Sequence, residues 1–255
     1  MTIAITRTPS PRMSLCELEF VDRTRIDNER ATTQHQSYCQ LLKDLGVSVV
    51  TLPPLPEFPD SAFVEDVAIV LDEVAIMTSL GVASRRGETF EMESVLRGYR
   101  EIQRIELPAT IEGGDVLRVG KQLLVGDSSR TNLAGIECLR RLVSRYGYEV
   151  VPVPVSGCLH LKTACTSLDE TSLLVNSNWI DTRALTGYQL HHVSDDEPWG
   201  ANGLQLNQTI CMSAAHSKSR EYVQQLGYKV HTVELTEFAR AEAGITCLGL
   251  LFDHV

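Results

Sequence analysis

One pattern of elements recurs along the chain, and it constrains the fold more than any other feature of the sequence. In each repeat a short apolar strand, a tight turn and a second strand precede a segment with helical apolar spacing, and another strand follows. Four repeats are complete, and they begin after FPDSAFVED, IEGGD, CLHLKT and PWGAN. Such self-similarity is typical of folds in which equivalent units pack side by side.

Short polar turns are predicted between the first two strands of each repeat, at Asp72-Glu73, Lys121-Gln122, residues 169 to 171 and Asn207-Gln208. The helices before LGVSVV, YGYEVV and LGYKVH are each expected to end at the glycine. The third repeat has only a weaker helical segment, after SLLVNS.

A fifth repeat is split between the two ends of the chain. The strand TCLGLLF has no partner after it, whereas IAITRTP is followed by a predicted helix around residues 27 to 45 and by the strand VSVVTLP. Pairing of the terminal strands would close a ring of five ββαβ units and leave no open sheet edge. We therefore predict one compact α/β domain. A doubly wound open sheet is the alternative, but the short hairpins disfavour an all-parallel sheet.

Equivalent strand starts converge on the axis of such a ring, so a functional site is expected there. Aligning the repeats makes Phe63, Glu112 and His160 equivalent and places Glu112 and His160 opposite each other across the axis. A carboxylate beside an imidazole raises its basicity and fixes its tautomer, as a general base requires. A packed core histidine is the structural alternative.

Seven cysteines are scattered along the chain without CxxC pairs. This odd number fits neither a disulfide framework nor a four-thiolate zinc site, and most are expected to be reduced core residues. Cys247 is favoured as a nucleophile because it begins the ring-closing strand. Spacing alone does not separate it from Cys158 and Cys165, which lie near His160 in the sequence.

The charge balance excludes several classes of partner. A formal charge of −10 and a pI near 5.2 disfavour nucleic acids and anionic membranes, which require a basic surface. The N-terminal sequence MTIAITRTPSP does not resemble a secretory signal, and no apolar run approaches membrane-spanning length. A cytoplasmic protein is expected.

Several motifs together resemble a known family. FPDSAFVED, ASRRGET, EGGD, SSRTN, CLHLKTA and GITC occur in this order over nearly the whole chain, and they resemble the dimethylarginine dimethylaminohydrolases (dimethylargininases) of the guanidino-group modifying enzyme superfamily. The resemblance implies a five-bladed α/β propeller with pseudo-fivefold symmetry, as a single catalytic domain over residues 1–255, without metal or other cofactor. It also implies hydrolysis of Nω-methylated arginines to citrulline and dimethylamine or methylamine through a covalent cysteine thiouronium.

The resemblance also assigns roles to individual residues. Cys247 would be the nucleophile, His160 the general acid and base, and Glu112 its partner. Arginine suits recognition of a carboxylate because its planar fork donates two parallel hydrogen bonds. The implied substrate-binding residues are Asp60, Glu65 and Asp66 for the guanidinium and amine, Arg85 and Arg130 for the α-carboxylate, the carbonyl groups of Leu18 and Ala241 for the α-amino group, and Phe63 in the pocket.

Lys162 bears on which guanidine is bound. Arginine and agmatine deiminases of the superfamily typically carry an aspartate two residues after the catalytic histidine, where this chain has Lys162. Loss of that carboxylate leaves room for methyl groups and favours a methylated guanidino amino acid as the small-molecule partner. Deimination of arginine or another substituted guanidine is an alternative, as is a non-catalytic arginine-binding protein.

A metal site built from His160, Cys158 and the His191-His192 pair lacks a recognisable ligand spacing and is disfavoured. A homodimer is an assembly that the sequence allows.

Overall fold

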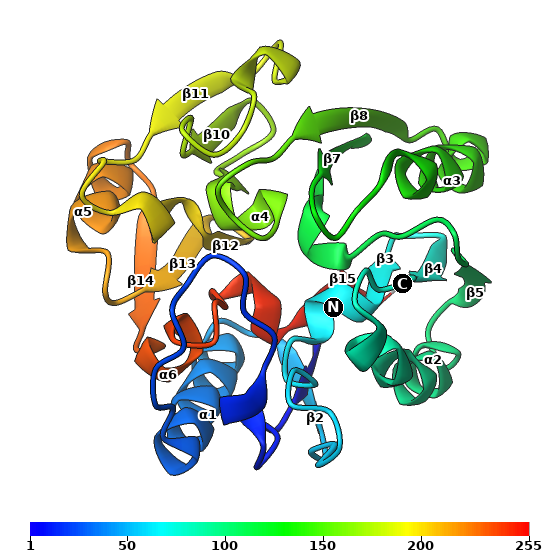
Figure 1. The fold of residues 1–255 in the computed structure, drawn as a ribbon. Coiled ribbons are helices and arrows are strands. Elements are labelled where there is room, and N and C mark those ends of the chain that lie inside the picture. Colours follow the sequence, from blue (N-terminus) through cyan, green and yellow to red (C-terminus); the bar gives the residue numbers. More distant parts are fainter. Residues whose placement is uncertain (255) are drawn as a thin grey trace.

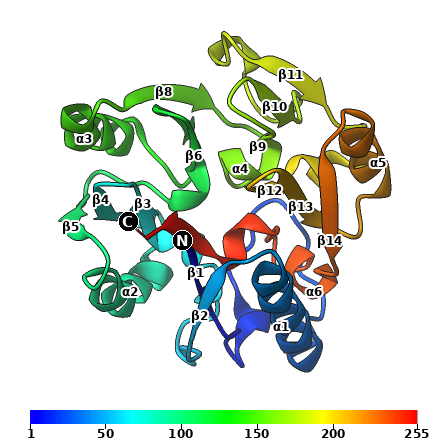
Figure 2. The same ribbon diagram turned by 180° about the vertical axis from the view of Figure 1, so that it is seen from behind.

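Five three-stranded sheets form the α/β fold of residues 1–254, which the computed structural model describes (Figure 1). The sheets are arranged around a common centre, and the longer helices lie at the outside of the ring in both views (Figures 1 and 2). These helices are α1 (Asn28–Asp44), α2 (Thr89–Leu96), α3 (Leu133–Val143) and α5 (Ser217–Gln225).

Every sheet has the same strand order. The middle strand pairs antiparallel with the strand on one side and parallel with the strand on the other. In this order the sheets are β3 (Ala68–Val70), β4 (Val74–Met77) and β5 (Glu101–Arg104); β6 (Val116–Val119), β7 (Gln122–Asp127) and β8 (Glu149–Pro154); β9 (Cys165–Ser167), β10 (Ser172–Val175) and β11 (Gln189–His192); β12 (Gly203–Leu206), β13 (Thr209–Ser213) and β14 (Lys229–Val233); and β15 (Leu250–Asp253), β1 (Thr2–Arg7) and β2 (Ser48–Leu52).

The fifth sheet joins the two ends of the chain. Strands β1 and β15 pair antiparallel, from Thr2 opposite Asp253 to Ile5 opposite Leu250, and β2 lies parallel on the other side of β1. This pairing confirms the split repeat predicted from the sequence.

Five hydrophobic clusters form the core, and each lies between two neighbouring sheets. The sheet of the terminal strands shares one cluster with β3-β4-β5 and another with β12-β13-β14, and the remaining clusters join the other neighbours in turn. Each small sheet therefore buries apolar side chains against both neighbours, which compensates for its limited size.

Capping residues and glycines set most helix ends. Asp27 accepts hydrogen bonds from two backbone amides in the first turn of α1, and Asn132 caps α3 through Gly135. The predicted glycine stops are confirmed, because Gly46, Gly147 and Gly227 follow the helical segments with φ of 84°, 78° and 96°. Such positive φ values cost little for glycine, which has no Cβ.

Two local predictions differ from the structure. The turn between β6 and β7 is formed by Gly120 and Lys121, one residue earlier than predicted, and Gly120 has a φ of 57°. Glycine at the first turn position explains the shift, because it adopts this conformation without strain. The weak helical segment of the third repeat is only the 3₁₀ turn η6 (Thr182–Ala184), and Gly187 follows with a φ of 90°.

Shorter helical segments complete the chain. None of the helices within residues 1–254 combines the length and apolar character needed to cross a membrane. The short segments are α4 (Leu161–Ala164), α6 (Thr236–Ala239), η1 (Met13–Leu15), η2 (Val64–Val67), η3 (Ala83–Glu88), η4 (Gly113–Asp115), η5 (Ser144–Tyr146), η7 (Pro198–Ala201) and η8 (Thr246–Leu248).

Candidate active site

A short helical turn precedes the first strand of the antiparallel pair in each sheet, and several predicted site residues lie on these turns or directly before them. The turns are η2, η4, α4, η7 and η8. Phe63, Glu112 and His160 stand directly before η2, η4 and α4. Glu65, Lys162 and Cys247 lie on η2, α4 and η8, each three residues before the following strand. The repeat thus brings side chains from distant parts of the chain to one centre.

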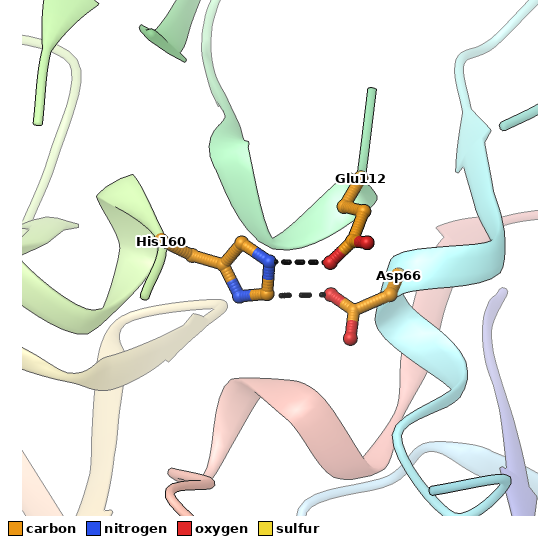
Figure 3. A group of neighbouring side chains, drawn as sticks. All are labelled: Asp66, Glu112 and His160. Atoms are coloured by element: carbon orange, nitrogen blue, oxygen red, sulfur yellow. Dashed lines mark hydrogen bonds and ion pairs between the residues drawn. The ribbon is translucent and has the colours of Figure 1, made fainter. Parts of the chain in front are cut away.

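His160 and Glu112 form a buried pair at this centre (Figure 3). The imidazole Nε2 lies 2.7 Å from Glu112 Oε2, and the two residues are 4% and 0% exposed. Asp66 approaches the other ring nitrogen, with Oδ1 3.9 Å from Nδ1. One ring nitrogen therefore contacts a carboxylate directly and a second carboxylate lies near the ring, an arrangement that favours the imidazolium form.

The charge of His160 follows from this setting. Burial by itself would lower the pKa of the imidazole, but the carboxylates of Asp66, Asp115 and Glu112 outweigh it and raise the pKa from 6.5 to about 9. His160 is therefore protonated at neutral pH and can donate a proton.

The two glycines of the EGGD motif allow this close packing. A Cβ at Gly114 would lie 2.7 Å from both Asp66 Oδ1 and His160 Nδ1, and a Cβ at Gly113 would lie 2.0 Å from the Glu65 carbonyl oxygen. The Gly114 amide also donates to Asp66 Oδ1 at 3.1 Å. Any side chain at these positions would push η4 away from η2 and separate the carboxylates from the imidazole.

Arg130 lies beside the second oxygen of Glu112. Its Nη1 is 3.8 Å from Glu112 Oε1, which also accepts a hydrogen bond from the Gly81 amide at 2.9 Å. The guanidinium is buried, and Nη1 has no hydrogen-bond partner within residues 1–254. Arg130 thus retains a donor for an additional anion.

Arg85, by contrast, is fully engaged. Its Nη1 donates to Asp66 Oδ2 at 2.8 Å, and Nε and Nη2 donate to Glu88 at 3.2 and 2.9 Å. Nη2 also reaches the Phe63 carbonyl at 3.4 Å. Arg85 therefore fixes Asp66 beside His160, and of the two arginines Arg130 has the greater capacity to bind an anion.

Glu65 and Lys162 form a second ion pair, with Lys162 Nζ 2.6 Å from Glu65 Oε1. Burial raises the pKa of Glu65, and Lys162 opposes this shift. Glu65 Oε2 is buried without a hydrogen-bond partner among residues 1–254. The pair therefore leaves one carboxylate oxygen able to accept from a bound guanidinium.

Cys247 lies on the same side of the molecule as these carboxylates. Its turn η8 packs against η2, and the side chain is partly buried. Burial, reinforced by the charges of Glu65 and Asp66, raises the thiol pKa to about 12, although the Gly244 amide donates to Sγ at 3.4 Å. The free protein therefore holds a neutral thiol among negative charges, where a cation would promote ionisation.

The remaining predicted residues border the same region. Leu18, Phe63, Ala241 and Cys247 belong to one hydrophobic cluster between the terminal sheet and its neighbour. Asp60 is buried, which raises its pKa, and its carboxylate accepts from the Glu17 amide at 3.2 and 3.3 Å. All the predicted site residues thus gather around one centre, and their roles stay predictions.

Sequence reasoning missed Asn202, which follows η7. Its Nδ2 donates to the Lys162 carbonyl at 2.8 Å and to Thr246 Oγ1 at 3.1 Å, while Oδ1 accepts from the Ile245 amide at 2.7 Å. Asn202 therefore links η7 to α4 and η8. Its position after PWGA, equivalent to the ends of the other short turns, was the available signal.

Asp115 is a further residue whose role sequence reasoning missed. It is completely buried and accepts hydrogen bonds from the Leu161 amide at 2.9 Å and from Ser128 Oγ at 2.6 Å. Burial raises its pKa to about 6. Asp115 thus holds the start of α4, and with it the backbone next to His160.

The suggested metal site around Cys158 and the His191-His192 pair is not assembled. Cys158 Sγ donates to the His160 carbonyl at 3.4 Å, and His191 contacts the Tyr222 hydroxyl at 3.2 Å. Within the described chain, the group of three metal-capable side chains is instead Asp66, Glu112 and His160. The guanidinium groups of Arg85 and Arg130 already lie within 4.0 Å of these carboxylates, so a metal cation would compete with two fixed positive charges.

A cavity of about 730 Å³ runs along the centre of the ring. Residues of β3, β6, β12 and β15 line it, and Glu65 and Lys162 contribute to its wall. Among its described lining residues are none of Cys247, His160 and Glu112. The Glu65–Lys162 pair therefore lies between this cavity and the residues gathered around His160.

Comparison with known proteins bears on this arrangement. The arginine deiminase family model matches residues 51–210. A dimethylarginine dimethylaminohydrolase of Pseudomonas aeruginosa is 32% identical over 97% of this chain and 98% of the relative. The chain belongs to the dimethylarginine dimethylaminohydrolase family. A family member from Streptomyces coelicolor is 34% identical over 97% of this chain and 95% of its own length.

Solved structures agree with this membership. The P. aeruginosa dimethylarginine dimethylaminohydrolase, as a cysteine-to-serine variant complexed with citrulline, has a TM-score of 0.92 at 31% identity and covers 98% of both chains. A histidine-to-glycine dimethylarginine dimethylaminohydrolase carrying an S-methyl-L-thiocitrulline adduct has a TM-score of 0.93, also at 31% identity, over 98% of this chain and 99% of its own.

Proposed function

We propose that this protein hydrolyses Nω-methylated arginines, asymmetric dimethylarginine and monomethylarginine, to citrulline and dimethylamine or methylamine. Membership of the dimethylarginine dimethylaminohydrolase family supports the reaction class. The citrulline complex and the thiocitrulline adduct of its relatives support the product and the site. The observation that carries the proposal is the buried His160–Glu112 pair beside Asp66, with the turn of Cys247 packed against the same segment.

Substrate binding would prepare the nucleophile. A guanidinium beside Glu65, Asp66 and Cys247 brings a positive charge to a thiol whose pKa is about 12. Unit charges ~4 Å apart attract by about 4 kcal/mol at an effective dielectric of about 20, equivalent to roughly three pKa units. The thiol proton would leave to solvent as the cation binds. The substrate thereby helps to ionise its own nucleophile.

In the first chemical step the Cys247 thiolate attacks the guanidinium carbon. The imidazolium of His160, whose pKa is about 9, protonates the departing amine as the carbon–nitrogen bond breaks. A covalent S-alkylthiouronium on Cys247 and a neutral imidazole result. Glu112 stabilises the imidazolium before the transfer and holds the ring in place.

In the second step His160 acts as a base. The neutral imidazole takes a proton from a water molecule as the water oxygen adds to the thiouronium carbon. Collapse of the tetrahedral intermediate expels the Cys247 thiolate, and the hydroxyl proton passes to solvent, which leaves citrulline. The imidazolium is thereby regenerated, and no net oxidation or reduction takes place.

The amino-acid end of the substrate would bind near the segment between β1 and α1. We assign the α-carboxylate chiefly to Arg130, whose Nη1 is unpartnered within residues 1–254, with Arg85 as a second cation. The carbonyl groups of Leu18 and Ala241 would accept from the α-ammonium, and Phe63 would line the pocket. Asp60 would add a further carboxylate for the guanidinium or amine.

Lys162 supports a methylated guanidine over arginine. It occupies the place where deiminases of the superfamily typically carry an aspartate, and it is bound to Glu65 rather than directed at an open substrate position. The match to the arginine deiminase family model favours deimination of arginine as the second candidate. Ammonia would then replace the alkylamine as co-product.

The assay follows directly from these alternatives. Purified protein is incubated with asymmetric dimethylarginine, monomethylarginine and arginine, and citrulline and the released amine are measured for each. The proposal requires faster turnover of the methylated arginines, its loss in Cys247→Ser, and its retention in Cys138→Ser, since Cys138 is also partly buried but lies on α3. Equal rates on all three substrates, or full activity of Cys247→Ser, would contradict it.

We further propose that the five sheets form a five-bladed α/β propeller with pseudo-fivefold symmetry, as a single catalytic domain over residues 1–255. The common strand order and the five inter-sheet clusters support this description. A cytoplasmic location and a homodimer stay predictions from the sequence.

A further inference from the structure

The segment between β1 and α1 covers the candidate site, and it crosses the front of the ring in Figure 1. Its backbone is held at two places. The Glu17 amide donates to the Asp60 carboxylate, and the amides of Glu19 and Phe20 donate to the Glu242 carboxylate at 2.7 and 3.0 Å. These contacts fix the position of the backbone from which the Glu19 side chain extends.

The carboxylate of Glu19 points to Arg130. Its Oε2 accepts hydrogen bonds from Ser129 Oγ at 2.9 Å and from Arg130 Nε at 3.4 Å. The Glu19 side chain is 36% exposed, whereas that of Arg130 is only 5% exposed. A partly solvated anion therefore contacts a buried cation at the edge of the site.

Arg130 is the cation best suited to receive an external carboxylate. Its Nη1 has no hydrogen-bond partner within the described chain, and the nearest carboxylate, Glu112, is 3.8 Å away. Glu112 is already committed to His160 and to the Gly81 amide. A carboxylate that paired end-on with Nη1 and Nη2 would lie against the negative charge of Glu112. Side-on pairing through Nη2 and Nε avoids this repulsion, and Nε is the nitrogen that Glu19 contacts.

We infer that Glu19 is a specificity-determining residue of this site: its carboxylate occupies the Arg130 donor that a substrate α-carboxylate needs, and the substrate must displace it. The inference rests on the proposed function. Glu19 would weaken binding only at the amino-acid end of the substrate. Ligands with an α-carboxylate encounter both the competition and the negative charge of Glu19. Ligands without that carboxylate do not require Nε of Arg130 and bind independently of Glu19.

The test compares two ligands that differ only in the carboxylate, citrulline and N-(4-aminobutyl)urea, whose dissociation constants are measured by calorimetry. Glu19→Gln is expected to tighten citrulline binding roughly fivefold, because a partly exposed ion pair contributes modestly. Binding of N-(4-aminobutyl)urea is expected to stay unchanged. Ser129→Ala should tighten citrulline binding in the same direction by a smaller factor.

Glu17→Gln is the matched control. Glu17 lies in the same covering segment, but its carboxylate accepts from Ser84 Oγ at 2.6 Å, so neither dissociation constant should change. Unchanged or weaker citrulline binding by Glu19→Gln would overturn the inference, as would equal changes for both ligands or no binding of citrulline to any variant.

Turnover separates this inference from the proposed function. If the function holds, Glu19→Gln lowers KM for asymmetric dimethylarginine and leaves kcat unchanged. If the wild-type protein forms no citrulline from any methylated arginine, the proposed function fails, and the calorimetric comparison still decides the role of Glu19.

Discussion

The side-chain amide of Asn202 donates a hydrogen bond of 3.1 Å to the hydroxyl of Thr246, the residue before Cys247. The same amide group holds the Ile245 amide and the Lys162 carbonyl. One buried residue therefore ties the turn of the proposed nucleophile to the turn that follows His160.

Replacing Asn202 should disturb both stability and catalysis. Asn202→Ala leaves the Ile245 amide and the Lys162 carbonyl without their partner, which is expected to cost about 2–4 kcal/mol of unfolding free energy. A shift of the Cys247 turn should also lower kcat roughly tenfold or more at nearly unchanged KM. Urea denaturation and steady-state kinetics measure the two effects. Asn178→Ala is the control, because Asn178 is exposed and bonds to the exposed Asp195; equal effects in both variants would contradict the prediction.

The stability of the protein is expected to depend on Lys162, the cation that pairs with the buried carboxylate of Glu65. Lys162→Met leaves a buried carboxylate without its cation, and we expect a loss of about 3–5 kcal/mol in unfolding free energy. The double variant Lys162→Met/Glu65→Gln should recover most of it, since the buried charge is gone. Lys218→Met, which breaks the exposed pair with Asp196, should change stability little. Urea is the suitable denaturant, because guanidinium resembles the proposed substrate.

The pKa of His160 predicts a measurable titration. The folded pKa of about 9 lies above the ordinary value of 6.5, so the stabilisation from the charged imidazole is complete below pH 6.5 and is lost as the pH rises through about 9. Nuclear magnetic resonance should place the imidazole midpoint near 9, with His160→Gln identifying the signal. Glu112→Gln removes a carboxylate and should lower the midpoint. A wild-type midpoint at or below 6.5 would refute the assignment.

The pKa of the Cys247 thiol is expected to fall when a cation binds in the site. Because burial and the carboxylates of Glu65 and Asp66 raise its pKa to about 12, little thiolate should be present at neutral pH. Methylguanidinium in the site should lower this pKa, by at most about three units. The ultraviolet absorbance of the thiolate, taken as the difference from Cys247→Ser, measures the shift. Methylurea has a similar shape without the charge, and an equal response to both ligands would contradict the electrostatic explanation.

Much of the fold can be predicted from the sequence, because local patterns encode each repeat. Alternating apolar residues, polar turns and glycine stops predict each hairpin and each long helix, and the unpaired strands at the two ends predict their pairing. The turn at Gly120 was misplaced by one residue because Lys121 and Gln122 are equally polar. The helix predicted near Thr182 is only a 3₁₀ turn, because its few apolar residues bury no continuous face.

The site could be predicted from the sequence only in part. Repeat alignment placed Glu112 opposite His160, and their contact is 2.7 Å. Asn202 and Glu19 were missed because their importance arises from contacts across units. The side chain of Asn202 bridges three short turns, and Glu19 reaches an arginine far along the chain. The repeat marks the position of Asn202, but the contacts that Asn202 and Glu19 make across units leave no periodic trace in the amino-acid sequence.

Cys247 lies just before β15, the strand that completes the sheet begun by β1. During synthesis the ribosome therefore releases the imidazole and every carboxylate of the site before it releases the sulfur. We therefore expect a polypeptide that ends before Cys247 to be unreactive towards guanidines, and the site to be complete only once β15 has paired with β1.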